Sequence, residues 1–193
     1  MFVVKLLFVT THFLKLKATS NDSEIDKSKS FSKIVRTYQE RLYWHIRQMV
    51  LVHDDANDVL QNTFLKAWKG LDNFRGDAKI STWLYRIATN ETLTFLAQKR
   101  MKHTLSIDET EDLLLQKMQA DAYFDGDEAQ LKLQKAILTL PEKQRLVFNM
   151  RFYEEMPYKE MSKILDTSVG ALKASYHHAS KKVEKFLKTE SDL

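Results

Sequence analysis

The stretch Leu71–Arg100 reads LDNFRGDAKISTWLYRIATNETLTFLAQKR. It brings aromatic and basic side chains together in one short helical region. Ser81 belongs to a residue type that favours helix N-caps, so we expect a helix from there to about Met101. Its apolar residues recur on one stripe, formed by Leu84, Ile87, Ala88 and Phe95. Trp83, Arg86 and Asn90 follow at i, i+3 and i+7 on a second stripe. The stretch therefore predicts a helix with one buried face and an exposed ring, guanidinium and amide.

This mixture of side chains is the one that binds single-stranded nucleic acid. Cations meet the phosphates and aromatic rings stack on unpaired bases. The loop before the helix adds two further cations, Arg75 and Lys79. A core interpretation remains open from the spacing alone, with a partly buried Trp83, an ion-paired Arg86 and a solvated Asn90.

Composition predicts an all-α protein with two small helical domains. The 193 residues include only four glycines and two prolines, which leaves little turn chemistry for a sheet. A chain of this length buries one medium core or two small ones. The absence of cysteine excludes disulfides and thiolate zinc sites, and is common in cytosolic proteins. The net charge of +4 is compatible with a nucleic-acid partner without requiring one.

Residues 1–30 are expected to be a flexible or non-core extension. The apolar run Met1–Leu16 is interrupted by Lys5, His12 and Lys15, and is shorter than the ~20 residues of a spanning helix. Residues 19–30 are polar and rich in serine, which is typical of a flexible segment. We therefore expect a cytoplasmic protein whose working part begins near residue 31.

The residues that follow this extension divide into a helical domain and a linker. Residues 31–103 are predicted to form a bundle of three or four helices, with an amphipathic helix over 32–52 and a second helix from Asp54 and Asp55 to about Leu71. Residues 104–127 carry an excess of acidic side chains without strong periodicity, so they are predicted to be a linker.

Residues 128–193 carry the pattern of a helix-turn-helix. A helix over 131–140 is followed by Pro141, which suits the first turn of the next helix to about Phe152. A short helix, 158–165, then a turn, 166–168, and a long helix, 169–187, complete the motif. Small residues near the start of the long helix allow close approach to DNA, and basic residues follow on its exposed side. The candidate contacts are Gly170, Ala171, Lys173, Ala174, His177 and Lys181.

The order of motifs in both halves resembles one family of proteins. Residues 54–100 resemble region 2 of the extracytoplasmic-function (group 4) sigma factors of bacterial RNA polymerase. The likeness lies in Asp54-Asp55-Ala56, Asp58-Val59-Leu60-Gln61-Asn62-Thr63-Phe64, Ala67-Trp68, Phe74-Arg75-Gly76-Asp77 and Thr82-Trp83-Leu84-Tyr85-Arg86-Ile87-Ala88-x-Asn90. The block from Leu140-Pro141-x-Lys143-x-Arg145 to Val183 is similar to region 4 of the same family.

The resemblance implies a role for each group of residues. It implies that a dissociable factor directs core RNA polymerase to promoters, and that region 2 melts and captures the minus-ten element with a flipped base beside Asn90. The implied minus-ten contacts are Arg75, Lys79, Trp83, Arg86 and Asn90. The implied polymerase-binding residues are Asp55, Asp58, Gln61, Asn62 and Phe64. Region 4 would read the minus-thirty-five duplex, but Ser175, His178 and Ser180 stand where family members commonly carry arginine, which leaves the preferred sequence open.

The resemblance also implies partners. They are core RNA polymerase, promoter DNA in single-stranded and duplex form, and an anti-sigma factor, with no small-molecule substrate and no cofactor. The acidic linker, anchored by residues 113–115, would thread the RNA-exit side of the polymerase. No metal site is expected, because the adjacent His177 and His178 diverge by ~100° and lack further ligands nearby.

Two other classes of function remain to be compared with a sigma factor. A regulator that binds duplex DNA through the helix-turn-helix alone would leave Trp83 and Asn90 without a purpose. An enzyme would need a catalytic constellation, and the sequence contains no paired-carboxylate arrangement, nucleophile motif, phosphate-binding glycine loop or H-E-x-x-H.

Overall fold

A computed structural model describes residues 22–102 and 128–189 of the chain. These two ranges contain α-helices and one short 3-10 helix, with no strand, which confirms the all-α prediction. The elements are α2 (Asp22–Val50), α3 (His53–Gly70), η1 (Leu71–Asn73), α4 (Ile80–Lys102), α6 (Glu128–Leu138), α7 (Glu142–Phe152), α8 (Tyr158–Leu165) and α9 (Val169–Thr189). The predicted extension up to residue 21, most of the acidic linker and its proposed anchor at 113–115 lie outside the described residues.

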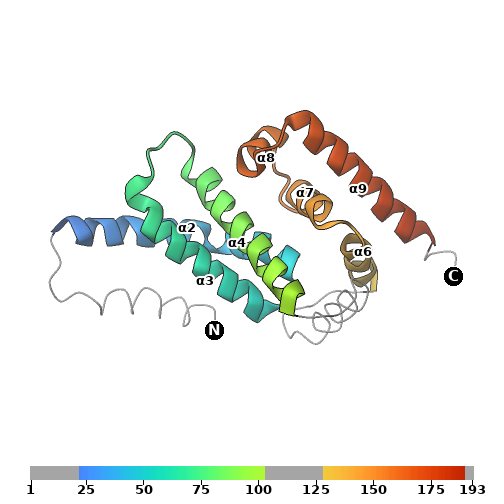
Figure 1. The fold of residues 1–193 in the computed structure, drawn as a ribbon, viewed down its shortest axis with the longest axis horizontal. Coiled ribbons are helices and arrows are strands. Elements are labelled where there is room, and N and C mark those ends of the chain that lie inside the picture. The colour runs from blue at the N-terminus through green and yellow to red at the C-terminus, as the bar shows by residue number, and fades with distance from the viewer. Residues whose placement is uncertain (1–21, 103–127, 190–193) are drawn as a thin grey trace.

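The helices α2, α3 and α4 pack against one another and form the N-terminal unit (Figure 1). Each presents one apolar stripe to the shared core, as the helical spacing of the sequence predicts. The stripe of α4 is buried at Leu84 and Ala88 and half-buried at Ile87 and Phe95. The other fully buried side chains of this core include Leu42, Ile46, Val59, Phe64 and Ala67.

The first helix begins earlier than the sequence pattern indicates. Instead of starting near residue 32 after a flexible segment, α2 begins at Asp22. Tertiary contacts explain the difference. The Nζ atom of Lys27 lies 2.5 Å from Asp72 in η1 and 4.8 Å from the ring centroid of Trp68. The polar, serine-rich start of α2 is therefore held against the end of α3, which local composition does not reveal.

The C-terminal unit contains α6, α7, α8 and α9, with α9 in contact with the other three helices. Pro141 and Pro157 immediately precede α7 and α8, where a missing backbone N–H costs nothing. Asp166 ends α8 in the left-handed conformation, with φ of 50°, and Ser168 Oγ accepts a hydrogen bond from the Ala171 N–H at 3.2 Å. Short helix, tight turn and long helix confirm the predicted helix-turn-helix.

The two units are in direct contact. α7 packs against α2, and α8 packs against α4 (Figure 1). The apolar core of the N-terminal unit continues into the C-terminal unit through Met150, Met161 and Leu172, each almost completely buried. A second cluster lies wholly inside the C-terminal unit and contains Ala136, Ile137, Leu140, Phe148, Ala179 and Val183. None of the helices in the described ranges is long and apolar enough to cross a membrane.

The core of the N-terminal unit provides a first test. Replacing the fully buried Leu42 by Ala removes three methyl(ene) groups and leaves a cavity, so L42A should lower the free energy of unfolding by about 2–5 kcal/mol. The matched control on the same helix is Glu40→Ala, which changes an exposed side chain and should stay within about 0.5 kcal/mol. Urea denaturation followed by circular dichroism measures both. Equal effects of the two substitutions would contradict the assignment of Leu42 to the core.

Candidate nucleic-acid interface

The helix α4 places Trp83 and Asn90 in different environments. The Trp83 ring is half-buried and packs over the end of α3, so that a Cβ atom added to Gly70 would lie 3.2 Å from Trp83 Cζ2. Its centroid is 5.0 Å from that of Phe74, with the two planes inclined by 37°. Asn90 is exposed and makes no hydrogen bond with another described residue. The expected stripe thus consists of a packed ring and a free amide.

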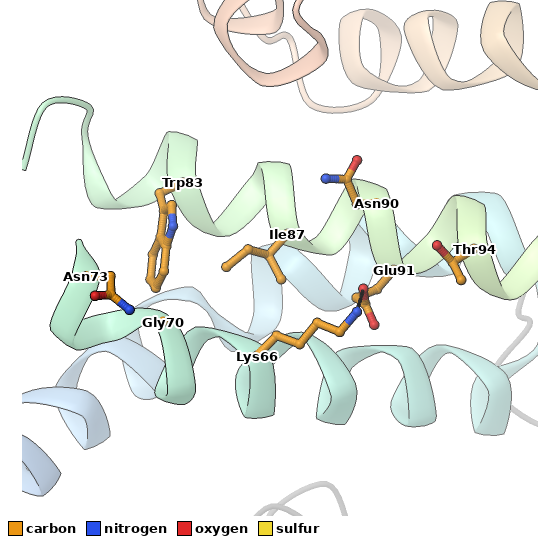
Figure 2. A pocket seen from close by; sticks show the side chains of 8 residues that line it. All are labelled: Lys66, Gly70, Asn73, Trp83, Ile87, Asn90, Glu91 and Thr94. Atoms are coloured by element: carbon orange, nitrogen blue, oxygen red, sulfur yellow. Dashed lines mark hydrogen bonds and ion pairs between the residues drawn. The ribbon is translucent and has the colours of Figure 1, made fainter. Parts of the chain in front are cut away.

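These two residues border the same shallow pocket, which has a volume of about 500 Å³. The pocket lies along α3 and α4, and its lining residues are Lys66, Gly70, Asn73, Trp83, Ile87, Asn90, Glu91 and Thr94. In Figure 2 the Trp83 ring points toward Gly70, whereas the Asn90 amide points away from α3. A pocket of this size accommodates a small flat ligand such as a nucleobase.

The charges in this pocket are paired. Lys66 Nζ lies 2.5 Å from Glu91 Oε1, an ion pair that bridges α3 and α4 (Figure 2). The pocket therefore presents the Trp83 ring and the aliphatic Ile87 side chain rather than net charge, while the Asn90 amide points outward from its edge. Sequence reasoning missed Lys66 and Glu91, because their contact depends on the register between two helices.

The loop before α4 exposes two cations near the pocket. Arg75 and Lys79 are exposed, and neither is paired with a carboxylate in the described part of the chain. Gly76 lies between them with φ of +79°, a conformation that a residue with a Cβ adopts at a cost. Arg75, Lys79 and Asn90 are thus three exposed polar side chains without a hydrogen-bond or ion-pair partner among the described residues.

Arg86 lies on the exposed side of α4 but is already engaged. Its guanidinium donates a hydrogen bond to the backbone carbonyl of Lys163 in the last turn of α8. The family resemblance implied that this cation contacts either the phosphates or a neighbouring base. In this arrangement of the two units the guanidinium instead contacts the protein.

The face of α3 predicted to bind a partner is largely open. Asp58, Gln61 and Asn62 are exposed. Asp55 is paired with Lys99 of α4 at 2.6 Å. Phe64 is buried, with its ring 6.2 Å from that of Phe31, so it supports the helix from inside. The polar residues of α3 can therefore meet a partner directly, whereas the Phe64 side chain cannot.

All six predicted contact residues of α9 are exposed: Gly170, Ala171, Lys173, Ala174, His177 and Lys181. A Cβ atom added to Gly170 would meet no atom within 4 Å, so the space around the start of the helix is open. Lys173 Nζ lies 6.0 Å from the Tyr158 ring centroid. The surface combines small residues with cations, as recognition helices do.

Further along α9, one acid is shared by two lysines. Glu184 accepts from Lys188 at 2.7 Å and from Lys181 at 3.3 Å. Lys188 and then Lys181 hold the pKa of this carboxyl below its usual range. Because its contact with Glu184 is longer, the Lys181 ammonium is held less tightly than the Lys188 ammonium. Within the described ranges no group of three or more His, Asp or Glu side chains is arranged to bind a metal ion.

Comparisons with known proteins match both units. The family model described as sigma-70 region 2 matches residues 34–101, and the model described as sigma-70 region 4 matches residues 130–183. The chain is 31% identical over 167 residues to the ECF RNA polymerase sigma factor SigW of Bacillus subtilis, covering 82% of this chain and 89% of that protein. It is 29% identical over 164 residues to the ECF RNA polymerase sigma-E factor of Escherichia coli K12, covering 81% and 85%.

Solved structures share the fold. One is the sigma factor RpoE in complex with the anti-sigma factor NepR from Bartonella quintana, with a TM-score of 0.63, 20% identity, and coverage of 83% of this chain and 98% of that one. Another is CnrH in complex with the cytosolic domain of CnrY, with a TM-score of 0.61, 22% identity, and coverage of 83% and 89%. With both regions matched in order and the helix-turn-helix in place, this chain belongs to the extracytoplasmic-function sigma factors of the sigma-70 family.

Proposed function

We propose that this sigma factor captures the minus-ten promoter element at the pocket between α3 and α4, and reads the minus-thirty-five element with α9. The observation that carries the proposal is Asn90. Its amide is exposed, unpaired among the described residues, and borders a pocket that Trp83 also lines. An amide offers a donor and an acceptor, which together read the edge of an unpaired base.

Each part of the interface has a distinct task in this proposal. A flipped base binds at the outer edge of the pocket that the half-buried Trp83 ring lines, where hydrogen bonds to the outward-pointing Asn90 amide return part of the unstacking energy. Arg75 and Lys79 in the adjoining loop bind the phosphates of the same strand. Trp83 lies over Gly70 and is fixed in place, so it forms a preorganised wall.

The exposed polar face of α3 is the proposed docking site for core RNA polymerase. The exposed side chains of this face include Asp58, Gln61 and Asn62. None of the three makes a hydrogen bond or ion pair with another described residue. One solved structure with this fold is a sigma factor in complex with an anti-sigma factor, and on that basis we include an anti-sigma factor among the partners of this chain. Polymerase, promoter and the factor would meet in the cytoplasm, without cofactor or small-molecule substrate.

The minus-ten assignment predicts the effect of a single substitution. Asn90→Ala removes the base-reading amide, and losing one good base contact should lower transcription roughly 10- to 100-fold. The assay is run-off transcription with core polymerase lacking other sigma factors, on sheared genomic DNA of the source organism. Gln98→Ala, an exposed change two turns further along α4, is the control and should leave transcript yield unchanged.

A gel-shift measurement with core polymerase accompanies this assay. N90A should bind polymerase as well as the unmodified protein does, because Asn90 lies on α4 and away from the proposed docking face of α3. Normal transcription by N90A would remove Asn90 from the site. Failure to bind polymerase would instead assign the residue to folding or docking.

The assignment of α9 predicts a change in salt dependence. Lys173→Ala with Lys181→Ala removes two exposed cations, so duplex affinity should fall and the slope of log K against log salt should decrease by about 2. Fluorescence anisotropy with promoter duplexes, identified from the start sites of the transcripts, measures the slope. Lys69→Ala, an exposed lysine of α3, is the control. An unaltered slope in the double variant would show that these lysines do not meet phosphate.

A further inference from the structure

The exposed face of α9 begins with small residues. The buried positions of this helix are Leu172, Ala179 and Val183. At ~100° per residue, Ala174 lies on the opposite side, near the middle of the open face. Gly170 and Ala171 precede it on the same side, and all three are exposed. The first two turns of this face therefore carry no side chain that can form a hydrogen bond.

His177 and His178 are the first hydrogen-bonding side chains on this face. They leave the helix axis ~60° to one side and ~40° to the other side of Ala174. Both are exposed, and their ring centroids are 5.9 Å apart, with the planes inclined by 65°. Side chains of a helix lean toward its N-terminus, which directs the two rings over the turn that contains Ala174. The small residues thus leave room for the imidazoles and for a ligand in front of them.

Neither imidazole has a partner elsewhere in the described part of the chain. The two rings contact each other, and no other ring contact, hydrogen bond or ion pair involves them. The helices packed against α9 are α6, α7 and α8, and none of their charged side chains pairs with either ring. The titratable groups that α7 and α8 bring to this side of α9 include Arg151 and Tyr158, whose ring centroid lies 5.4 Å from the Arg151 guanidinium and 6.0 Å from Lys173 Nζ. The ring nitrogens of both histidines are therefore free to bind a ligand.

The lysines of α9 differ from the histidines, because most of them already have a partner. Lys173 lies over an aromatic ring of α8, and Lys182 Nζ donates to Gln144 Oε1 of α7 at 3.2 Å. Two further lysines of α9 share the Glu184 carboxylate. The helix contains no arginine, the residue that most often binds guanine. The polar side chains of the open face that have no partner are therefore the two histidines and, two turns further on, Lys185.

Guanine is the base that suits a ring which can only donate hydrogen bonds. A protonated imidazole carries an N–H at each ring nitrogen and has no acceptor. In the major groove guanine presents two acceptors, N7 and O6, whereas adenine and cytosine present an amino donor that would oppose an N–H. A neutral imidazole keeps one acceptor nitrogen and loses this selectivity. The charge state of the ring thus decides which base it recognises.

Duplex DNA favours the charged form of both rings. Histidine changes its charge between about pH 5 and 8. His177 and Lys181 are four residues apart on the helix, and like charges at that spacing repel each other in the free protein. A duplex carries one negative charge per ~1.7 Å of its axis, so its phosphates offset this repulsion when α9 enters the groove. Protonation of the rings and binding of the duplex therefore favour each other.

We propose that His177 and His178 are the base-reading residues of α9 and bind guanine as protonated imidazoles, so that recognition of the minus-thirty-five duplex takes up protons. The inference rests on the function proposed above for α9, and adds the reading residues, the base and the charge state. Duplex affinity then falls as the pH rises, because deprotonation removes one donor and the positive charge of each ring.

Selection of duplexes by the full chain tests the proposal without transcription. The probe is a pool of double-stranded DNA of random sequence, from which the protein selects at about pH 6. The selected duplexes should carry G·C pairs at fixed positions, and their affinity, measured by fluorescence anisotropy, should fall roughly 10- to 100-fold from about pH 6 to about pH 8. Replacing their guanines by 7-deazaguanine removes N7 and keeps base pairing, so it should remove most of this pH dependence.

Two double variants at these positions separate the charge of the rings from their shape. His177→Gln with His178→Gln cannot be protonated, so its affinity at about pH 6 should equal that of the unmodified protein at about pH 8. His177→Arg with His178→Arg stays charged, so its affinity should be high and independent of pH. Lys185→Ala removes an exposed cation of the same face and is the matched control, which should weaken binding equally at both pH values. All these positions are exposed, and circular dichroism should show unchanged helix content.

Each outcome bears on a different part of the proposal. A pH dependence that survives in the double glutamine variant would overturn the role of the histidines. One that survives 7-deazaguanine would show that the rings meet phosphate, and would overturn base reading. Proton-dependent selection by a protein that supports no run-off transcription would uphold the inference and count against the proposed function. Transcription with pH-independent duplex binding would overturn the inference alone, and failure to select any duplex would overturn it together with duplex reading by α9.

Discussion

The packing of α4 on three sides is the constraint on which the rest of the structure depends. α4 contacts α2 and α3 within its own unit and α8 in the other unit. Its buried positions therefore include polar residues as well as Leu84 and Ala88. Thr92 Oγ1 donates to the Ala88 carbonyl at 2.8 Å, while Thr89 meets His45. Only a narrow strip of α4 is left exposed, and that strip carries Arg86 and Asn90. One helix thus holds the fold together and supplies the residues proposed to contact DNA.

The sequence predicts most helix boundaries because local signals mark them. The prolines before α7 and α8 and the turn at Asp166 lie where backbone chemistry alone requires a break. The start of α2 is not marked in this way, since its serine-rich first turns are held by the distant contacts of Lys27. The contact between units is equally hidden. His45 meets partners 44 and 109 residues away, and no periodicity along one helix reveals such a distance.

The candidate site shows the same difference between what the local sequence predicts and what distant contacts decide. Spacing placed Trp83, Arg86 and Asn90 on one stripe of α4, and the structure gives each of them a different surrounding. Trp83 packs over Gly70, Arg86 is bound to α8, and Asn90 remains free. Helical spacing determines the direction in which a side chain leaves the helix axis. Whether that side chain is covered depends on the neighbouring element. The pocket residues Lys66 and Glu91 depend on the register of α3 against α4, which required the structure.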